Sequence, residues 1–504
     1  MACSKEGDDY VNHVHKEDPS GEDDNETQSI NIMPEILRQL TPEEYKKVGD
    51  KATSKMDMMI LPCLMLMYIL NYLDRNNIAS AKLANIAEDL DLTPTEYQSC
   101  ISIFFAGYIL MQVPSNMMLG KFKWPGVYIC TAMGVWGVVS AAQTMVQNFT
   151  GLAIARFFIG FVEAVFFPGG LFYLSLFYNR KQYAFRAALF YSGSQLGNAF
   201  GGLLAIGILE LDGKHGLEGW RWVSHAASLF LVEGVVTIGL AIVFALVLPN
   251  SPRQIRSLTE TEKAWVLWNQ QQDQGQSDDR SEITARTGLS LALKDPKTWL
   301  FLTTLYAIYT SAGVTNFFPP VVSTLGYDRT VTLALTAPPF VLCCITMLVV
   351  GFHSDRFCER YWHISLPLVI TMVANIIAVS TLNTAARYTA MMLMPASFYA
   401  AVVVLLSWIT GTLNQPVAKR AAAIALIISI CNTSNIWTPY LYNSAPRYLV
   451  AFTMNLVAAA AAVLVATITR FYLQRENQKL DDGKPVGKSG PTEAQIASEF
   501  RYQL

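Results

Sequence analysis

Apolar residues occur in a dozen long stretches separated by shorter polar segments. Each stretch is close to the length of roughly 20 residues that crosses a hydrocarbon core of about 30 Å as a helix. Six stretches precede a polar segment near the middle of the chain and six follow it. The pattern predicts an all-α membrane protein with 12 transmembrane helices at 58–81, 98–119, 127–147, 150–177, 185–209, 229–248, 299–324, 331–352, 363–382, 388–413, 420–443 and 448–470.

The polar segments divide the chain further. The start of the chain is acidic and has little to bury, which is typical of disorder. Thr41-Pro42-Glu43-Glu44 then combines an N-cap residue, Pro at the first helical position and Glu three residues after the cap, a typical helix start. The predicted order is a disordered cytosolic tail with a short juxtamembrane helix at 1–55, a six-helix bundle at 56–248, a cytosolic linker at 249–298, a second six-helix bundle at 299–474 and a cytosolic tail at 475–504.

Composition and charge argue against several classes of function. Charged residues make up 15% of the chain, against about 25% in ordinary soluble domains. A net charge of −2 gives no electrostatic footprint for nucleic acid. The six histidines are scattered and no nucleophile stands beside a base, so we expect no enzymatic activity.

The sequence also lacks the usual cysteine and nucleotide-binding motifs. The eight cysteines form no CxxC pair, and no G-x-x-x-x-G-K-[ST] sequence occurs. We therefore expect no metal and no cofactor. If the function is transport, it must draw on an ion gradient or on downhill flow of the substrate.

Lys and Arg are more frequent in the loops that follow even-numbered predicted spans than in the alternate loops. Because cytoplasmic loops accumulate these residues, we expect both termini in the cytosol. We also expect a multi-pass membrane protein of the plasma membrane, and an organelle membrane is the alternative that this count leaves open. Asn148-Phe149-Thr150 is a glycosylation sequon on the predicted outer side. It lies in a short turn beside the bilayer, which favours an unmodified asparagine.

Charged residues within the predicted helices are the main candidates for chemistry. A charge at the centre of a membrane helix costs about 2.5–3.5 kcal/mol on an insertion scale, so such residues are functional candidates. Three positions stand out: the Asp74-Arg75 pair, Arg156 and Glu163. The Asp74-Arg75 pair is equally compatible with an outer position beyond the end of its helix.

Arg156 and Glu163 are two helical turns apart and share one face of their helix, about 10 Å apart along its axis. This separation is too long for a direct bond, so each needs a partner from another helix. Asp74 and Arg75 are the nearby opposite charges. The alternative is that two buried ion pairs only fix helix packing.

Several segments together resemble the major facilitator superfamily, specifically the fungal branch of the anion:cation symporter family that includes allantoate and nicotinate permeases. Single segments are weakly specific, but their order and spacing across the whole membrane region are specific. The matching segments are Lys55-x-Asp57 through Pro62, YILNYLDRNNIASAKL (68–83), FFAGYILMQVPSN (104–116), ARFFIGFVEAVFFPGGLFYLSLFY (155–178), EGWRW (218–222), LGYDRTVTLALTAPPF (325–340), GFHSDR (351–356), AKRAAAIA (418–425) and APRY (445–448).

The resemblance implies a major facilitator fold of two pseudo-symmetric bundles with a central cavity. There, Asp74 and Arg75 would meet Arg156 and Glu163. Asp74 and Glu163 would carry protons, while Arg75 would alternate between Glu163 and the substrate carboxylate. The remaining family positions are Arg156, Tyr72, Tyr108, Gln195 and Asn432 or Asn435 for substrate binding, and Gly351, Asp355 and Arg356 for gating.

The resemblance favours proton-coupled uptake of a small organic anion by a monomer that contacts membrane lipid and no nucleic acid. The proton would be the coupling ion. Two alternatives remain open: export of an acidic secondary metabolite, and a nutrient receptor that moves no substrate. Residues 223–228 depart from the family pattern, and an insertion there is a further expectation.

Overall fold

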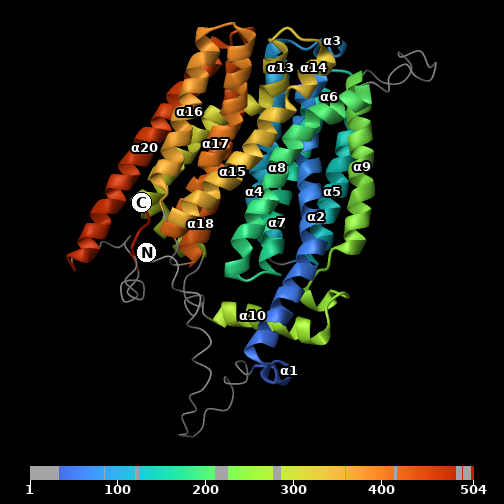
Figure 1. The fold of residues 1–504 in the computed structure, drawn as a ribbon. Helices are drawn as coiled ribbons and strands as arrows, with labels where there is room; N and C mark the ends of the chain where they lie inside the picture. Colours follow the sequence, from blue (N-terminus) through green and yellow to red (C-terminus); the bar gives the residue numbers. More distant parts are fainter. Residues whose placement is uncertain are drawn as a thin grey trace.

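The helices stand side by side in two groups, one coloured blue to green and the other yellow to red (Figure 1). This computed structural model describes residues 33–83, 86–119, 122, 124–209, 225–275, 285–357, 359–413, 417–483, 491 and 501–504. Every regular element within those ranges is helical. The prediction of an all-α membrane protein is therefore confirmed.

The first group contains the helices expected for the first bundle. Its elements are α2 (Pro42–Leu83), α3 (Ile86–Asp89), α4 (Pro94–Leu119), α5 (Pro125–Ala142), η2 (Gln143–Met145), α6 (Phe149–Glu163), α7 (Phe166–Ser175), α8 (Arg180–Leu209) and α9 (His225–Val247). Of the segment 223–228, residues 223–224 lie outside the described residues and 225–228 belong to the start of α9.

The second group contains the helices of the second bundle. Its elements are α12 (Pro296–Ser311), η5 (Ala312–Phe317), α13 (Phe318–Ser323), α14 (Arg329–Ala334), α15 (Ala337–Phe357), α16 (Tyr361–Ser380), α17 (Thr384–Thr412), α18 (Val417–Asn432), α19 (Ser434–Trp437), η6 (Thr438–Leu441) and α20 (Leu449–Asp481). Short helices flank or connect the two groups: α1 (Glu35–Arg38), η3 (Pro252–Gln254), α10 (Glu260–Gly275) and α11 (Ala285–Lys294).

Nine helices within the described residues are long and apolar enough to cross a membrane. The other three predicted spans coincide with α4, α8 and the α12–α13 segment. Several predicted spans are interrupted rather than continuous: the one at 150–177 divides into α6 and α7. Pro168 lies in the first turn of α7 and has no N–H for the carbonyl four residues earlier, so proline favours this break directly after Glu163.

Helix α2 is much longer than the span predicted for it. It begins at Pro42, where Thr41 and Glu44 cap each other: the Thr41 N–H donates to Glu44 Oε2 at 2.9 Å and the Glu44 N–H to Thr41 Oγ1 at 3.3 Å. The segment predicted as a separate juxtamembrane helix continues without interruption into the membrane span. Because it is continuous, α2 directly connects α10 to the residues around Asp74.

Helices α4 and α6 approach each other closely at two glycines. A Cβ atom on Gly107 would overlap the carbonyl oxygen of Phe157, and one on Gly160 would overlap that of Phe104. Small residues allow such backbone contact between membrane helices. The contact fixes α6, with Arg156 and Glu163, against the aromatic residues of α4.

The two groups meet along α8 and α15 and at the end of the bundle that carries α13, which we call the α13 end. There, Gln98 of α4 donates to Asn443, and the hydroxyls of Ser99 and Tyr440 are 3.0 Å apart. Gly202 of α8 lies against the Leu333 carbonyl and Thr336. Helix α10 lies at the opposite end, the α10 end (Figure 1).

Residues 501–504 pack onto the second group at the α10 end. The indole N–H of Trp408 donates to the Gln503 carbonyl at 2.8 Å, and Asn477 exchanges two hydrogen bonds of 2.9 Å with the Tyr502 backbone. Tyr502 is buried. This part of the predicted cytosolic tail therefore has a fixed position in the structure.

Candidate functional site

The centre of the candidate site is an ion pair between α2 and α6. Arg75 Nε and Nη2 both donate to Glu163 Oε2, each at 3.4 Å. The Glu163 side chain is fully buried, and its other oxygen, Oε1, has no hydrogen-bond partner among the described residues. Glu163 is the last residue of α6, immediately before the break that precedes α7. The carboxylate of the pair is thus held at a helix terminus, whereas Arg75 lies within the continuous helix α2.

Three aromatic rings surround the Arg75 guanidinium. Its Cζ atom is 4.9 Å from the ring centroid of Tyr72, 4.9 Å from that of Tyr108 and 5.2 Å from that of Phe104. Rings at this distance attract a cation through their quadrupole, more strongly when the site is desolvated. The guanidinium is therefore stabilised even when its carboxylate partner is elsewhere, and it can bind another anion.

Arg156 does not contact either carboxylate. Its Nη2 donates to the Arg75 carbonyl at 2.9 Å and its Nη1 to the Asp74 carbonyl at 3.4 Å, while Cζ lies 4.9 Å from the centre of the Phe104 ring. The side chain is almost completely buried. In this structure Arg156 binds the α2 backbone beside the ion pair and is not exposed to a ligand.

Asp74 faces away from Arg75, toward α5 and α9. Its carboxylate accepts hydrogen bonds from Ser140 Oγ at 2.7 Å, Trp136 Nε1 at 3.1 Å and Thr237 Oγ1 at 3.3 Å. Of the four charges expected to meet, the structure therefore joins Arg75 to Glu163 directly. Among the described residues, Asp74 and Arg156 share a hydrogen bond through the Asp74 backbone carbonyl and no direct bond between their side chains.

Glu233 is a buried carboxylate that the sequence patterns did not single out. It lies in α9, is 2% exposed, and accepts a hydrogen bond from Asn77 of α2. The signal was present, because an acidic residue within the apolar stretch 229–248 meets the same criterion as Glu163.

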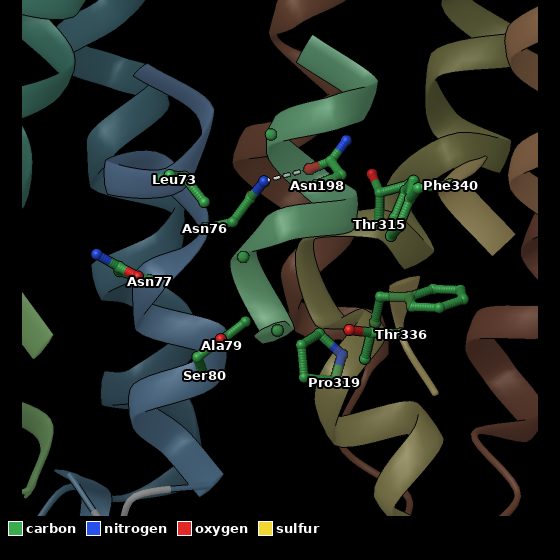
Figure 2. A pocket seen from close by; sticks show the side chains of 14 residues that line it. Leu73, Asn76, Asn77, Ala79, Ser80, Asn198, Thr315, Pro319, Thr336 and Phe340 are labelled. Carbon is green, nitrogen blue, oxygen red and sulfur yellow. Dashed lines mark hydrogen bonds between the residues drawn. The ribbon is translucent and has the colours of Figure 1, made fainter. Parts of the chain in front are cut away.

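Gln195 links the two groups of helices. Its Oε1 accepts from Asn198 Nδ2 at 3.3 Å and from Cys343 Sγ of α15 at 3.8 Å. Asn198 in turn accepts from Asn76 Nδ2 at 2.5 Å. Figure 2 shows this bond on one side of a small cavity of about 20 Å³, with Thr315 and Thr336 on the other. Such a cavity has room for about one water molecule.

The residues expected from the second bundle lie at the break after α18. Asn435 Oδ1 accepts from Asn316 Nδ2 of η5 at 3.0 Å, and Asn432 is the half-buried last residue of α18. Nearby, Trp437 Nε1 donates to the Tyr306 hydroxyl at 2.9 Å. Tyr309 and Tyr399 of this group pack against the same hydrophobic core that contains Tyr108 of α4. The aromatic surroundings of Arg75 therefore face the second group.

The expected gating residues lie in the C-terminal part of α15, at the α10 end of the molecule. Gly351 lies within that helix, Arg356 is exposed, and Asp355 accepts a hydrogen bond from Arg360 Nη1 at 2.6 Å. Arg360 Nε also donates to Gln503 Oε1 at 3.0 Å. The sequence pattern gave no indication of Arg360, which connects this turn to residues 501–504.

Two bundles of membrane helices around buried, paired charges are the structure of a membrane transporter. The chain belongs to the Major Facilitator Superfamily, whose family model matches residues 64–439. It is therefore a multi-pass membrane transporter and not an enzyme.

Sequence similarity to named fungal transporters supports this assignment. The chain is 30% identical over 451 residues to the MFS-type transporter cnsO of Penicillium expansum, covering 85% of this chain and 84% of that protein. It is 25% identical over 471 residues to the high-affinity nicotinic acid transporter of Saccharomyces cerevisiae, covering 92% and 86%.

Solved structures share the fold. A bacterial homologue of the human lysosomal transporter Spinster, in an inward-facing and occupied conformation, is 18% identical with a TM-score of 0.60, covering 85% of this chain and 98% of that chain. The proton:xylose symporter XylE, bound to 6-bromo-6-deoxy-D-glucose, is 16% identical with a TM-score of 0.61, covering 88% and 100%. The predicted major facilitator fold is confirmed.

Proposed function

We propose that this transporter takes up a small organic carboxylate together with protons, by alternating access, as a member of the anion:cation symporter branch. The observation that carries the proposal is the Arg75–Glu163 pair, in which a cation surrounded by aromatic rings is neutralised by a single buried carboxylate. The similarity to a nicotinic acid transporter supports an organic acid as substrate.

The pair provides a physical mechanism for coupling. A substrate carboxylate that binds the planar guanidinium of Arg75 competes with Glu163 for the same donors. Glu163 is then a buried carboxylate without a counterion, and such a group is more stable when it is protonated. Binding of the anion therefore favours binding of a proton, and the coupling is reciprocal.

The other expected residues have supporting roles in this proposal. Tyr72 and Tyr108 border the anion site beside Arg75, and Arg156 holds the α2 backbone in position. Gln195, Asn432 and Asn435 complete the substrate surface between the groups. Gly351, Asp355 and Arg356 belong to the gate at the α10 end, and Asp74 is a second proton-handling carboxylate.

The proposed setting is the plasma membrane, with both termini and the α10 end in the cytosol. The distribution of Lys and Arg among the loops supports this orientation. The two groups of helices would then rock around the Arg75–Glu163 pair to expose it alternately to each side.

A cellular uptake screen tests the proposal. The full chain is produced in a yeast host that lacks its own organic-acid permeases, and entry of radiolabelled nicotinate, pantothenate and allantoate is measured over a range of external pH. The proposal expects one of these acids to enter faster at acidic external pH than in cells with empty vector. Faster efflux of the preloaded acid instead would indicate export, and no flux of any acid in either direction would contradict the proposal.

A further inference from the structure

A second group of buried carboxylates lies behind α2, on the side away from the Arg75–Glu163 pair. Asp74 and Asn77 are one turn apart on α2, and Glu233 and Thr237 are one turn apart on α9. Thr237 donates to Asp74, and Asn77 donates to Glu233. Each carboxylate therefore accepts a hydrogen bond from the other helix, so both lie in the same α2–α9 interface. In Figure 2 the Asn77 side chain points to a different side of α2 from that of Asn76, although both residues line the cavity.

The two carboxylates have unequal hydrogen bonding. Asp74 accepts three hydrogen bonds, from Ser140, Trp136 and Thr237, which suit an ionised group. Within the part of the chain that the structure describes, Glu233 accepts one, from Asn77, and its buried Oε1 atom has no hydrogen-bond partner. An ionised carboxylate with so few donors is strongly disfavoured in a desolvated position.

The neighbouring elements supply Glu233 with no cation within the described residues. Asp74 of α2 is the charged group that acts on it electrostatically. Helix α5 contributes Trp136 and Ser140, and η2 contributes the amide of Gln143. On α8, the cation Arg186 is bound to Asp57.

Counting charges around α2 shows that one carboxylate of the set must be neutral for the charges to balance. Arg75 and Arg156 supply two positive charges, whereas Asp74, Glu163 and Glu233 would supply three negative charges if all were ionised. One proton on Glu233 balances this set. When a substrate anion binds Arg75 and Glu163 takes up a proton, the set is again balanced with Glu233 still neutral.

We infer that Glu233 binds a proton in this conformation, and that Asp74 and Glu233 form a proton-binding pair distinct from the Arg75–Glu163 ion pair. The inference rests on the proposed function in one respect, that Asp74 handles protons. It adds a distinction between two protons. One stays bound to Glu233, and the other is taken up and released by Glu163.

Infrared spectra of the purified full chain, compared between H2O and D2O, test the inference without a substrate. A buried protonated carboxyl absorbs at a C=O frequency separate from that of carboxylates, and the band shifts in D2O. We expect this band in the wild-type protein at neutral pH, its loss in Glu233→Gln, and its retention in Glu163→Gln and in the exposed control Glu260→Gln. A band that persists in Glu233→Gln, or no band in the wild type, would overturn the inference.

A second variant covers the case in which Glu233→Gln does not fold. Asn77→Ala removes the one donor to Glu233, so we expect the C=O band to move in frequency while its intensity is kept. An unmoved band would assign the proton to another residue and overturn the inference. Failure of the proposed function is distinguishable, because a protein that moves no organic acid can still show or lack this band.

Discussion

Arg75 is the residue on which the proposed anion site depends, and its geometry distinguishes arginine from lysine. Two nitrogens of one planar guanidinium contact the same Glu163 oxygen while three rings lie around it. A lysine ammonium is a compact charge that cannot make this forked contact. The site is therefore built for the shape of the cation as well as for its charge.

Arg75→Lys should weaken uptake of the transported acid by roughly tenfold or more. Losing one hydrogen bond to a charged group costs about 1.5 kcal/mol or more, which is close to the free energy of a tenfold change in binding. The apparent affinity for the acid, measured in the uptake assay, checks this result. Arg253→Lys, in the exposed η3 segment, is the matched control, and wild-type affinity in Arg75→Lys would contradict the role of Arg75.

The sequence predicted individual charges better than their contacts. Arg75 and Glu163 pair as the spacing of charges in their two helices suggested. The positions of Asp74 and Arg156 depend on which way each side chain leaves its helix. Adjacent residues such as Asp74 and Arg75 point about 100° apart, so Arg75 faces α4 and α6 while Asp74 faces α5 and α9. Periodicity within one helix cannot determine which neighbour covers each face.

At the scale of elements, close contacts between helices position the residues of the site. Gly160→Ala should destabilise the protein by about 1–3 kcal/mol, because the added methyl overlaps the Phe104 carbonyl and overpacking has a cost of this size. It should also reduce uptake, because α6 carries Glu163. Gly239→Ala in α9 is the control, since its Cβ meets nothing within 4 Å. Equal thermal stability of the two variants would contradict the close α4–α6 contact.

The contact between α10 and α2 should depend on pH. Lys55 Nζ lies 2.7 Å from Glu262 Oε2. Burial raises the pKa of Glu262, but hydrogen bonds from Lys55 and Thr259 outweigh it and leave that pKa below its ordinary value. Because the folded-state pKa is lowered, the stabilisation is present above the unfolded value of about 4.3 and is lost as the pH falls through the folded value.

Hydrogen exchange of residues 260–275 measures this contact. Glu262→Gln should increase exchange in α10 at neutral pH relative to the wild type, and the difference should disappear as the pH falls below about 4. Glu260→Gln, whose side chain is 83% exposed, is the control. A difference that stays constant with pH would show that the charge of Glu262 does not hold α10.

The positions of the membrane spans were predictable from apolar length, whereas the interruptions within them and the extension of α2 beyond its span were not. Hydropathy alone assigned one span each to 150–177 and 420–443, but both contain breaks. Breaks at membrane depth occur where neighbouring helices or cavities satisfy the freed backbone groups, and those neighbours are distant in the sequence. The same reason explains why the docking of residues 501–504 had no local signal.

At the scale of the whole molecule, the orientation in the membrane is directly testable. Epitopes fused before Met1 and after Leu504 should be stained in permeabilised cells and protected in intact cells. The excess of Lys and Arg in alternate loops gives this expectation. Staining of either epitope in intact cells would reverse the proposed orientation and would place the α10 end outside the cytosol.

The most direct test of proton coupling uses purified protein in vesicles, with the acid identified by the uptake screen. An inward pH gradient should drive accumulation of that acid by the wild type. Glu163→Gln should lose this accumulation while still exchanging labelled for unlabelled acid at equal pH, because Arg75 remains available to the anion. Accumulation by Glu163→Gln that responds to the pH gradient as the wild type does would contradict the account.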